Sequence, residues 1–105
     1  QGQSATGWRK DAKGQWSYLK DAKGTKATGW LKDNGTWYYL NAEGVMQTGW
    51  VKDNGTWYYL DGSGAMQTGW KYVGGQWYYL SGSGALLVNT TTPDGYKVNA
   101  NGELV

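Results

Sequence analysis

The chain has 105 residues, enough for one small domain, and 10 basic against 8 acidic residues leave a formal net charge of only +2. It contains neither cysteine nor histidine. Disulfides and thiolate metal sites are therefore excluded, and the commonest general base and metal ligand is missing. Because no apolar run reaches membrane-spanning length, we expect no membrane insertion.

The apolar inventory is dominated by rings. Phenylalanine is absent, whereas 8 tryptophans and 9 tyrosines make up 16% of the residues. Tryptophan and tyrosine must supply most of the buried area, at roughly 150–250 Å² per ring. Since this set cannot fill one compact core, we expect burial to be spread along stacked repeats.

A repeated pattern accounts for all eight tryptophans. Thr-Gly-Trp occurs at residues 6–8, 28–30, 48–50 and 68–70, and the last three copies are spaced by 20 residues. A second tryptophan follows each copy, at the start of the tetrads 16–19, 37–40, 57–60 and 77–80. A fixed period of this length predicts a repeat architecture.

Each repeat is predicted to be a β-hairpin. In the first, the three-residue loop 12–14 suits Gly14 in the left-handed region. In the second and third, Asn-Gly is the preferred type I′ turn pair, and Gly74-Gly75 serves the fourth. Pairing outward from these turns predicts one register throughout: Trp8 opposite Tyr18, Trp30 opposite Tyr39, Trp50 opposite Tyr59 and Trp70 opposite Tyr79.

Side chains alternate between the two faces of each hairpin. In the third hairpin, Trp50, Trp57 and Tyr59 should share one face, and Tyr58 should lie on the other. We interpret Tyr58 and its equivalents Tyr38 and Tyr78 as structural cover on that opposite face.

The segments between hairpins carry turn residues. Turns are predicted to begin at Asn41, Asp61 and Ser81 and to end at a glycine, followed two positions later by Met46, Met66 and Leu86. An isolated hairpin is marginally stable, so each should lean on its neighbour through these connectors. The predicted fold is all-β: an elongated β-solenoid of stacked hairpins. Residues 1–85 would form four repeats (about 6–25, 26–45, 46–65 and 66–85), and residues 86–105 a degenerate C-terminal cap.

The aromatic face has two interpretations. The rings either pack against the neighbouring hairpin and bind nothing, or they form a cage for a cation. Indole offers the best π face for a cation. A quaternary ammonium suits it because this ion donates no strong hydrogen bonds to water, so the rings compete well with water for it.

The pattern Gly-Trp … Trp-Tyr-Tyr-Leu at this period closely resembles the choline-binding repeats of streptococcal and phage cell-wall proteins, from about Thr6 to Leu86. The resemblance implies a left-handed solenoid with a ligand site between consecutive hairpins. It further implies a non-catalytic, secreted module that needs no cofactor. Such a module would bind choline or the phosphocholine of teichoic and lipoteichoic acids and anchor a parent protein to the bacterial cell wall.

In this family each site would combine both tryptophans of one repeat with the second tetrad tyrosine of the next and an apolar connector residue. Carried over, this predicts three sites: Trp30, Trp37, Tyr59 and Met46; Trp50, Trp57, Tyr79 and Met66; and Trp8, Trp16 and Tyr39, with Lys26 in the methionine position. Trp70 and Trp77 would form an incomplete site, because Lys97 stands at the tyrosine position. That unpaired site and the apolar C-terminal end suggest the hypothesis of a homodimer formed end to end.

Three other functions compete with this interpretation. Glucan-binding repeats also pair aromatic residues with glycine-rich hairpins, so carbohydrate binding is the alternative function. An enzyme is disfavoured, because no nucleophile–base pair or metal-ligand cluster is present and Asp33 and Asp53 fit turn chemistry. Single-stranded nucleic acid is disfavoured as a partner, because aspartates interrupt the lysines and no basic stripe forms.

Overall fold

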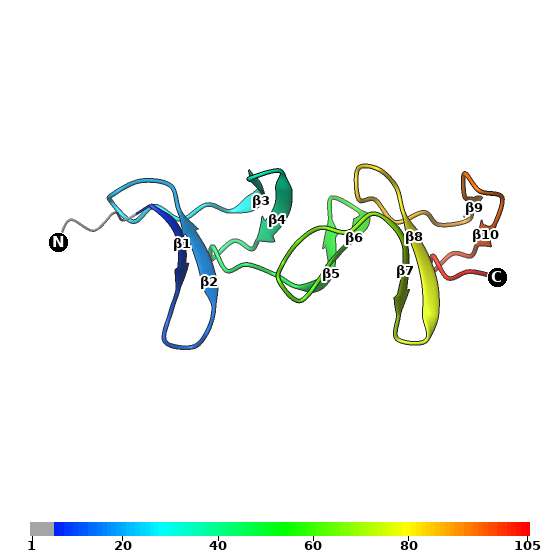
Figure 1. The fold of residues 1–105 in the computed structure, drawn as a ribbon, viewed down its shortest axis with the longest axis horizontal. Helices are drawn as coiled ribbons and strands as arrows, with labels where there is room; N and C mark the ends of the chain where they lie inside the picture. The colour runs from blue at the N-terminus through cyan, green and yellow to red at the C-terminus, as the bar shows by residue number, and fades with distance from the viewer. Residues whose placement is uncertain (1–5) are drawn as a thin grey trace.

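The computed structural model describes residues 6–105, which form an elongated rod of hairpins with extents of 55 × 23 × 21 Å (Figure 1). Residues 1–5 of the predicted repeat region lie outside the described part. Five two-stranded antiparallel sheets follow one another along the rod. The predicted all-β, elongated array of stacked hairpins is confirmed.

Four regular hairpins and one short hairpin make up these sheets. Their strands are β1 (Gly7–Lys10) with β2 (Trp16–Leu19), β3 (Gly29–Asp33) with β4 (Thr36–Leu40), β5 (Gly49–Asp53) with β6 (Thr56–Leu60), β7 (Gly69–Val73) with β8 (Gln76–Leu80), and β9 (Thr90–Thr91) with β10 (Lys97–Val98). In Figure 1 the hairpins point in different directions around the rod axis, and β7–β8 points the same way as β1–β2.

The predicted register is present in all four regular hairpins. Trp8 pairs with Tyr18, and the equivalent tryptophan–tyrosine pairs occur in the next three. The turn residues Asn34 and Asn54 have φ of 53°, and the glycines after them have φ of 85° and 83°. Positive φ at both central residues is what a type I′ turn requires. In the first hairpin Gly14 has φ of 84°, as the three-residue loop demands.

The connecting segments are tight turns built on one side-chain acceptor. Asn41 Oδ1 accepts hydrogen bonds from the backbone N–H groups of Glu43 and Val45, and Gly44 N–H donates to the Asn41 carbonyl. Asp61 makes the same two bonds through Oδ1, to Ser63 and Ala65. The predicted turns ending in glycine are therefore present.

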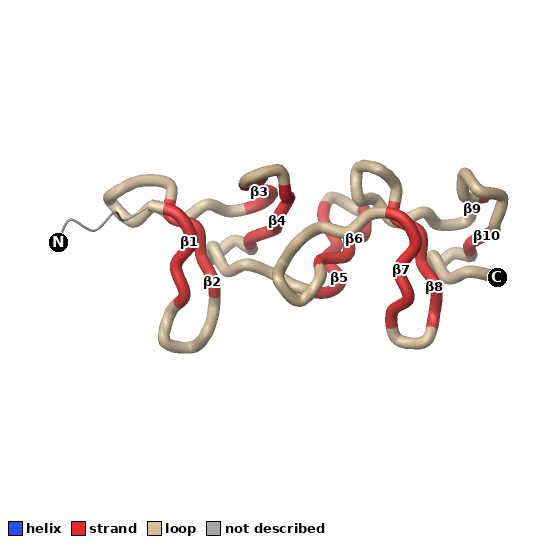
Figure 2. Tube along the Cα trace, in the orientation of Figure 1, coloured by secondary structure: helices blue, strands red, loops and turns tan. Residues whose placement is uncertain are grey.

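Backbone hydrogen bonds link the connectors to more distant hairpins. Each of these connectors bonds to the hairpin one repeat before the hairpin that it follows. Met46 N–H donates to the carbonyl of Trp16 at 2.7 Å, although Met46 follows the second hairpin and Trp16 belongs to the first. Met66, Leu86 and Leu104 donate in the same way to Trp37, Trp57 and Trp77, at 2.9, 2.8 and 2.9 Å. These loops, drawn in tan in Figure 2, join the sheets into one rod.

The core is a line rather than a cluster. Leu40, Leu60 and Leu80, the last residues of their tetrads, are completely buried (0% exposed), and Leu19 is nearly so. Each of the three fully buried leucines is bridged to the apolar residue of the connector that follows it, Leu60 for example to Met66, whereas Leu19 is bridged to Lys26. One buried leucine per repeat therefore fixes a hairpin to its own connector.

Acid is expected to destabilise the fold through the turn carboxylates. Hydrogen bonds from the Ser63 hydroxyl and the Ala65 and Ser63 N–H groups lower the pKa of Asp61, and the backbone of Gln15 and of Thr25 does the same for the pKa values of Asp11 and Asp21. A carboxyl group whose pKa is lower in the folded state stabilises that state above its unfolded pKa, near 3.9. We expect the melting temperature to be flat from about pH 7 to 5 and to fall below about pH 4.

Asp61→Asn is the matched control for this acid effect, because Asn41 makes the same turn without a charge. Thermal unfolding followed by circular dichroism should show a smaller loss between pH 7 and pH 3 for this variant. A loss as large as in the parent chain would show that Asp61 contributes nothing to the pH dependence.

Candidate functional site

Two tryptophans of each regular hairpin form two walls at nearly a right angle. The ring centroids of Trp8 and Trp16 lie 6.5 Å apart with 81° between the planes. The other three pairs repeat this geometry, at 6.4–6.5 Å and 84–87°. The first tryptophan also packs on the cross-strand tyrosine of its own hairpin, as Trp30 does on Tyr39 at 5.0 Å. That contact holds the first indole in place.

The third wall comes from the next hairpin, through the first tetrad tyrosine. Tyr38 lies 4.9 Å from Trp8, Tyr58 lies 4.7 Å from Trp30, and Tyr78 lies 4.9 Å from Trp50. This corrects the expectation that Tyr39, Tyr59 and Tyr79 fill that place and that the other three are structural cover. The face assignment holds, but the opposite face of each hairpin is the one turned toward the preceding tryptophans.

The apolar side chain of each site comes from one connector later than expected, so each methionine serves the hairpin before its own. Met46 lies beside Trp8 and Trp16, and Met66 beside Trp30 and Trp37. The expectation grouped Met46 with Trp30 and Trp37, and Met66 with Trp50 and Trp57. The hydrogen bonds from connector to preceding hairpin, such as Met46 N–H to the Trp16 carbonyl, cause the shift.

The C-terminal hairpin completes the site beside Trp70 and Trp77. Tyr96 lies 5.9 Å from Trp70, and Tyr96 and Leu104 line the space beside the two indoles. Lys97 was expected at the tyrosine position, but the tyrosine immediately before it takes that place. Tyr96 is the counterpart of the first tetrad tyrosine Tyr78, because Val98 is bridged to Leu104 as Leu80 is to Leu86, so this site follows the same rule as the other three.

The structure thus contains four similar spaces, which we call hollows 1 to 4. Their aromatic and apolar walls are, in order: Trp8, Trp16, Tyr38 and Met46; Trp30, Trp37, Tyr58 and Met66; Trp50, Trp57, Tyr78 and Leu86; Trp70, Trp77, Tyr96 and Leu104.

Lys26 does not line hollow 1. An added Cβ at Gly44 would lie 2.8 Å from Lys26 Cβ and 2.9 Å from its Cδ, so the lysine stem packs on this glycine. Met46 packs on Gly64 and Met66 on Gly84 in the same way. Lys26 therefore occupies the methionine position one repeat before the one that serves hollow 1.

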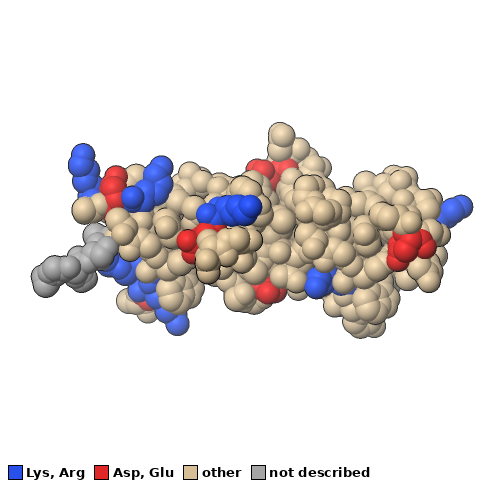
Figure 3. Space-filling view, turned by 45° about the horizontal axis from the view of Figure 1, so that its top comes forward, with Lys and Arg blue, Asp and Glu red and all other residues tan. Residues whose placement is uncertain are grey.

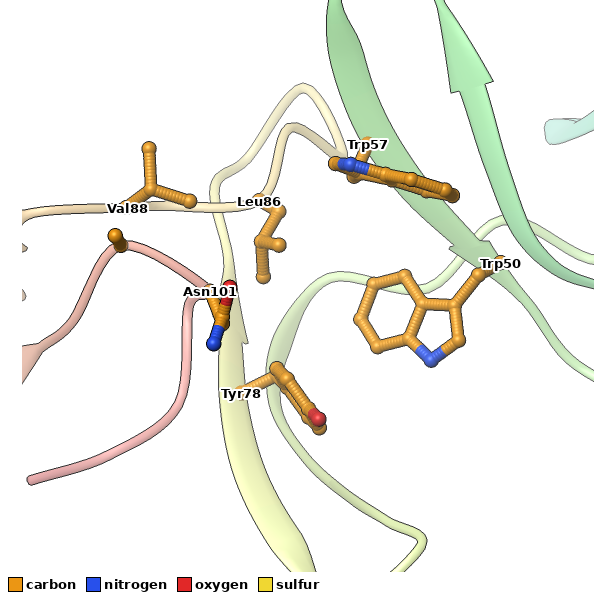
Figure 4. A pocket seen from close by; sticks show the side chains of 7 residues that line it. Trp50, Trp57, Tyr78, Leu86, Val88 and Asn101 are labelled. Carbon is orange, nitrogen blue, oxygen red and sulfur yellow. The ribbon is translucent and has the colours of Figure 1, made fainter.

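The hollows are open spaces between the rings. In Figure 4 the indoles of Trp50 and Trp57, the Tyr78 ring and Leu86 surround a common space. The volumes of the four hollows are about 310–420 Å³, at the low end for ligand sites. The second tryptophan of each pair remains 38–44% exposed. Close packing alone would leave neither such a space nor such exposure of large rings.

Carboxylates from the following hairpin hold the first tryptophan of three hollows. The indole N–H groups of Trp8 and Trp30 donate to Asp33 and Asp53 at 3.1 Å, and Trp70 donates to Asp94 at 2.8 Å. The sequence alone predicts only a turn role for Asp33 and Asp53. Their recurrence at the end of the first strand was the available signal, but the partner lies 23 or 25 residues away.

Other charges and hydrogen bonds surround the hollows without lining them. The pKa of Tyr39 is raised, mainly by burial and secondly by the nearby Asp53 carboxylate. The Tyr39 hydroxyl lies 3.4 Å from Asp53. The ammonium groups of Lys10, Lys32 and Lys52 lie 5.8 Å from the ring centroids of Trp16, Trp37 and Trp57. No lysine is among the lining residues, so these ammonium groups approach from outside the hollows.

The remaining surface is mixed in charge. Figure 3 shows lysines and acidic residues interspersed on the visible face, with no continuous basic stripe there. Within residues 6–105, no group of three or more acidic side chains could hold a metal ion. In the same part of the chain, no helix is long and apolar enough to cross a membrane.

Comparison with protein families gives two matches along the chain. The choline-binding repeat matches residues 27–67 and 47–90, and the putative cell wall binding repeat matches residues 6–25. A search of curated protein sequences found no match.

Solved structures with the same architecture come from pneumococcus and its phage. Choline binding protein F of Streptococcus pneumoniae, in the presence of a peptidoglycan analogue, is 53% identical with a TM-score of 0.88 over 95% of this chain and 33% of its own. A choline binding domain of another S. pneumoniae protein is 55% identical, with a TM-score of 0.70 over 75% of this chain and 95% of its own. The cell wall endolysin of phage Cp-1, complexed with choline, is 36% identical, with a TM-score of 0.67 over 98% and 38%.

Repeated hairpins with an aromatic hollow at each junction define a cell-wall-binding repeat module. The family matches make the assignment specific: this chain belongs to the choline-binding repeat family. It spans about a third of the length of choline binding protein F.

Proposed function

We propose that this chain binds choline, or the phosphocholine of teichoic and lipoteichoic acids, in hollows 1 to 4. The observation that supports this most directly is the recurrence of one arrangement at four junctions, with two perpendicular indoles, a tyrosine and an apolar side chain around an open space. Three aromatic rings line each hollow and offer π faces to a bound cation.

A quaternary ammonium suits this environment for a physical reason. Each ring contributes on the order of 0.5–2 kcal/mol to a cation that it faces, and Trp contributes most. The methyl groups of the ammonium contact the apolar Met or Leu side chain. Water does not compete strongly for the ammonium, because the ammonium has no N–H group to donate a hydrogen bond. The small volume of each hollow fits a headgroup rather than an extended ligand.

Repetition supports a polymeric target at the cell surface. A single small ligand makes few contacts and binds weakly. Four hollows distributed along a 55 Å rod could engage several phosphocholines of one wall polymer, so that effective concentration raises the overall affinity. In this proposal the chain is a non-catalytic anchor of a secreted bacterial protein, with residues 1–85 as the repeats and residues 86–105 as the cap.

Choline titration should show which tyrosine completes hollow 2: Tyr58, as the structure indicates, or Tyr59, as expected from the sequence. Tyr58→Ala should weaken choline binding at hollow 2 by about 3- to 30-fold, because it removes a ring 4.7 Å from Trp30. Tyr59→Ala should leave hollow 2 unchanged, because Tyr59 packs on Trp50 at 4.9 Å. The indole N–H resonances of Trp30 and Trp37, followed by NMR during the titration, report on this site.

The same titration tests the proposed ligand. Choline should perturb the tryptophan signals, and dextran or neutral oligosaccharides should leave them unchanged. The reverse result would favour the carbohydrate-binding alternative, and no response to millimolar choline would exclude the proposed function.

Pairing of two copies at the C-terminal end remains a proposal with less support than the sequence suggested. Tyr96 and Leu104 close hollow 4 within one chain, so no second copy is needed there. The exposed C-terminal residue Val105 (74% exposed) remains as its basis. Sedimentation with and without choline tests it, and a monomer under both conditions would reject it.

A further inference from the structure

The four hollows differ in the charges around them, although their rings are alike. Hollows 1, 2 and 4 have a carboxylate that accepts the indole N–H of the first tryptophan, from Asp33, Asp53 and Asp94. In hollow 3 the equivalent position, the last residue of the first strand of the next hairpin, is Val73. Within residues 6–105, no side chain accepts a hydrogen bond from the Trp50 indole.

A second difference lies beside the second tryptophan. Lys10, Lys32 and Lys52 face it across the strands in hollows 1, 2 and 3, with the ammonium 5.8 Å from the ring centroid. In hollow 4 the residue opposite Trp77 is Tyr72, whose ring lies 5.1 Å away. Hollow 4 therefore has a carboxylate and no lysine, whereas hollow 3 has a lysine and no carboxylate.

Both differences change the affinity for a bound cation: the carboxylate raises it and the lysine lowers it. A carboxylate at the indole N–H adds electron density to the ring and attracts a positive ligand, from a part-buried position in hollows 1 and 2 and from an exposed one in hollow 4. A lysine ammonium over the second tryptophan competes for the negative face of that ring and repels the ligand. Neither effect acts on a neutral ligand of the same shape, for which only apolar contact matters.

We propose that Asp33, Asp53 and Asp94 are specificity-determining residues that make their hollows select a charged ligand, and that hollow 3, with Val73 at this position, is the least selective. This inference rests on the proposed function. Selectivity for a quaternary ammonium over its neutral isostere is highest in hollow 4, intermediate in hollows 1 and 2, and lowest in hollow 3. The chain thus carries graded sites on a repeated scaffold.

A merely structural role for the aspartates is the competing explanation, since each hydrogen bond also links two hairpins. The two roles separate because asparagine can accept the same indole hydrogen bond without a charge. Asp53→Asn retains the link to Trp30 and removes the attraction. A structural link predicts no change in ligand selectivity for this variant, whereas a charge effect predicts a change confined to hollow 2.

The experiment compares choline with 3,3-dimethylbutan-1-ol, in which a carbon replaces the charged nitrogen. The full chain is titrated with each compound, and the indole N–H resonance of each first tryptophan gives a Kd for its own hollow. The selectivity ratio is the Kd of 3,3-dimethylbutan-1-ol divided by the Kd of choline. This ratio should be highest in hollow 4, intermediate in hollows 1 and 2, and lowest in hollow 3. Asp53→Asn should lower the ratio at hollow 2 about 5-fold, and Val73→Asp should raise it at hollow 3 by a similar factor.

The outcomes distinguish this inference from the proposed function. If choline binds but the four ratios are equal and neither variant moves them, the inference is overturned and the proposed function stands. If neither compound binds any hollow, the proposed function itself fails. Unaltered hollows 1 and 4 in Asp53→Asn serve as the internal control for folding.

Discussion

Leu60→Ala is expected to lower the free energy of unfolding by about 2–5 kcal/mol, the range for removing a fully buried leucine side chain. Leu60 is 0% exposed and is bridged to Met66 in the connector that follows. In a rod with one such leucine per repeat, no second core layer exists to close over the cavity. Because small domains are stable by only about 5–15 kcal/mol, this one change should shift the urea midpoint strongly.

Urea unfolding followed by circular dichroism measures this effect, with Val105→Ala as the control. Val105 is 74% exposed, so its truncation should change the free energy of unfolding by less than about 0.5 kcal/mol. A Leu60→Ala variant within that same margin would contradict the assignment of the tetrad leucines as the core of the rod.

The local structure of this chain could be predicted from its sequence because short-range rules determine it. Asn-Gly dictates the turn, the turn dictates the register, and strand alternation dictates which rings share a face. The observed pairing of Trp50 with Tyr59 and the turns at Asn34 and Asn54 follow from these rules alone.

The way in which hairpins meet could not be predicted by the same means. Period and alternation show that Tyr58 and Tyr59 point to opposite faces, but not which face lies against the preceding tryptophans. That depends on the rotation between hairpins, which long-range hydrogen bonds such as Met46 N–H to the Trp16 carbonyl determine. The same bonds link each connector to the hairpin before its own, so the methionines shift by one repeat.

The aspartates were missed for a related reason. A carboxylate next to a turn has a sufficient local explanation, and Asp61 shows that explanation at work. Only the stacked structure reveals that Asp53 reaches the indole of Trp30 in the previous hairpin. Residues that serve a neighbouring repeat cannot be recognised within their own.

Gly64→Ala is expected both to destabilise the rod and to weaken ligand binding at hollow 1. An added Cβ would lie 2.5 Å from Met46 Sδ and 2.9 Å from Met46 Cε, so the end of the methionine side chain must shift from its place beside Trp8 and Trp16. The φ of Gly64 is +87°, a conformation that costs an alanine roughly 1–2 kcal/mol. We therefore expect a loss of at least this size, together with weaker choline binding at Trp8.

Gly24→Ala is the matched control, because it separates backbone strain from displacement of the methionine. Gly24 ends the equivalent turn with φ of +86°, and no heavy atom lies within 4 Å of its added Cβ. It should therefore show the strain alone and leave the Trp8 resonance and the Kd of hollow 1 unchanged. If the two variants lose equal stability and bind choline equally at hollow 1, Met46 is not a working wall of that hollow. The grouping of each methionine with the preceding hairpin would then have no functional meaning.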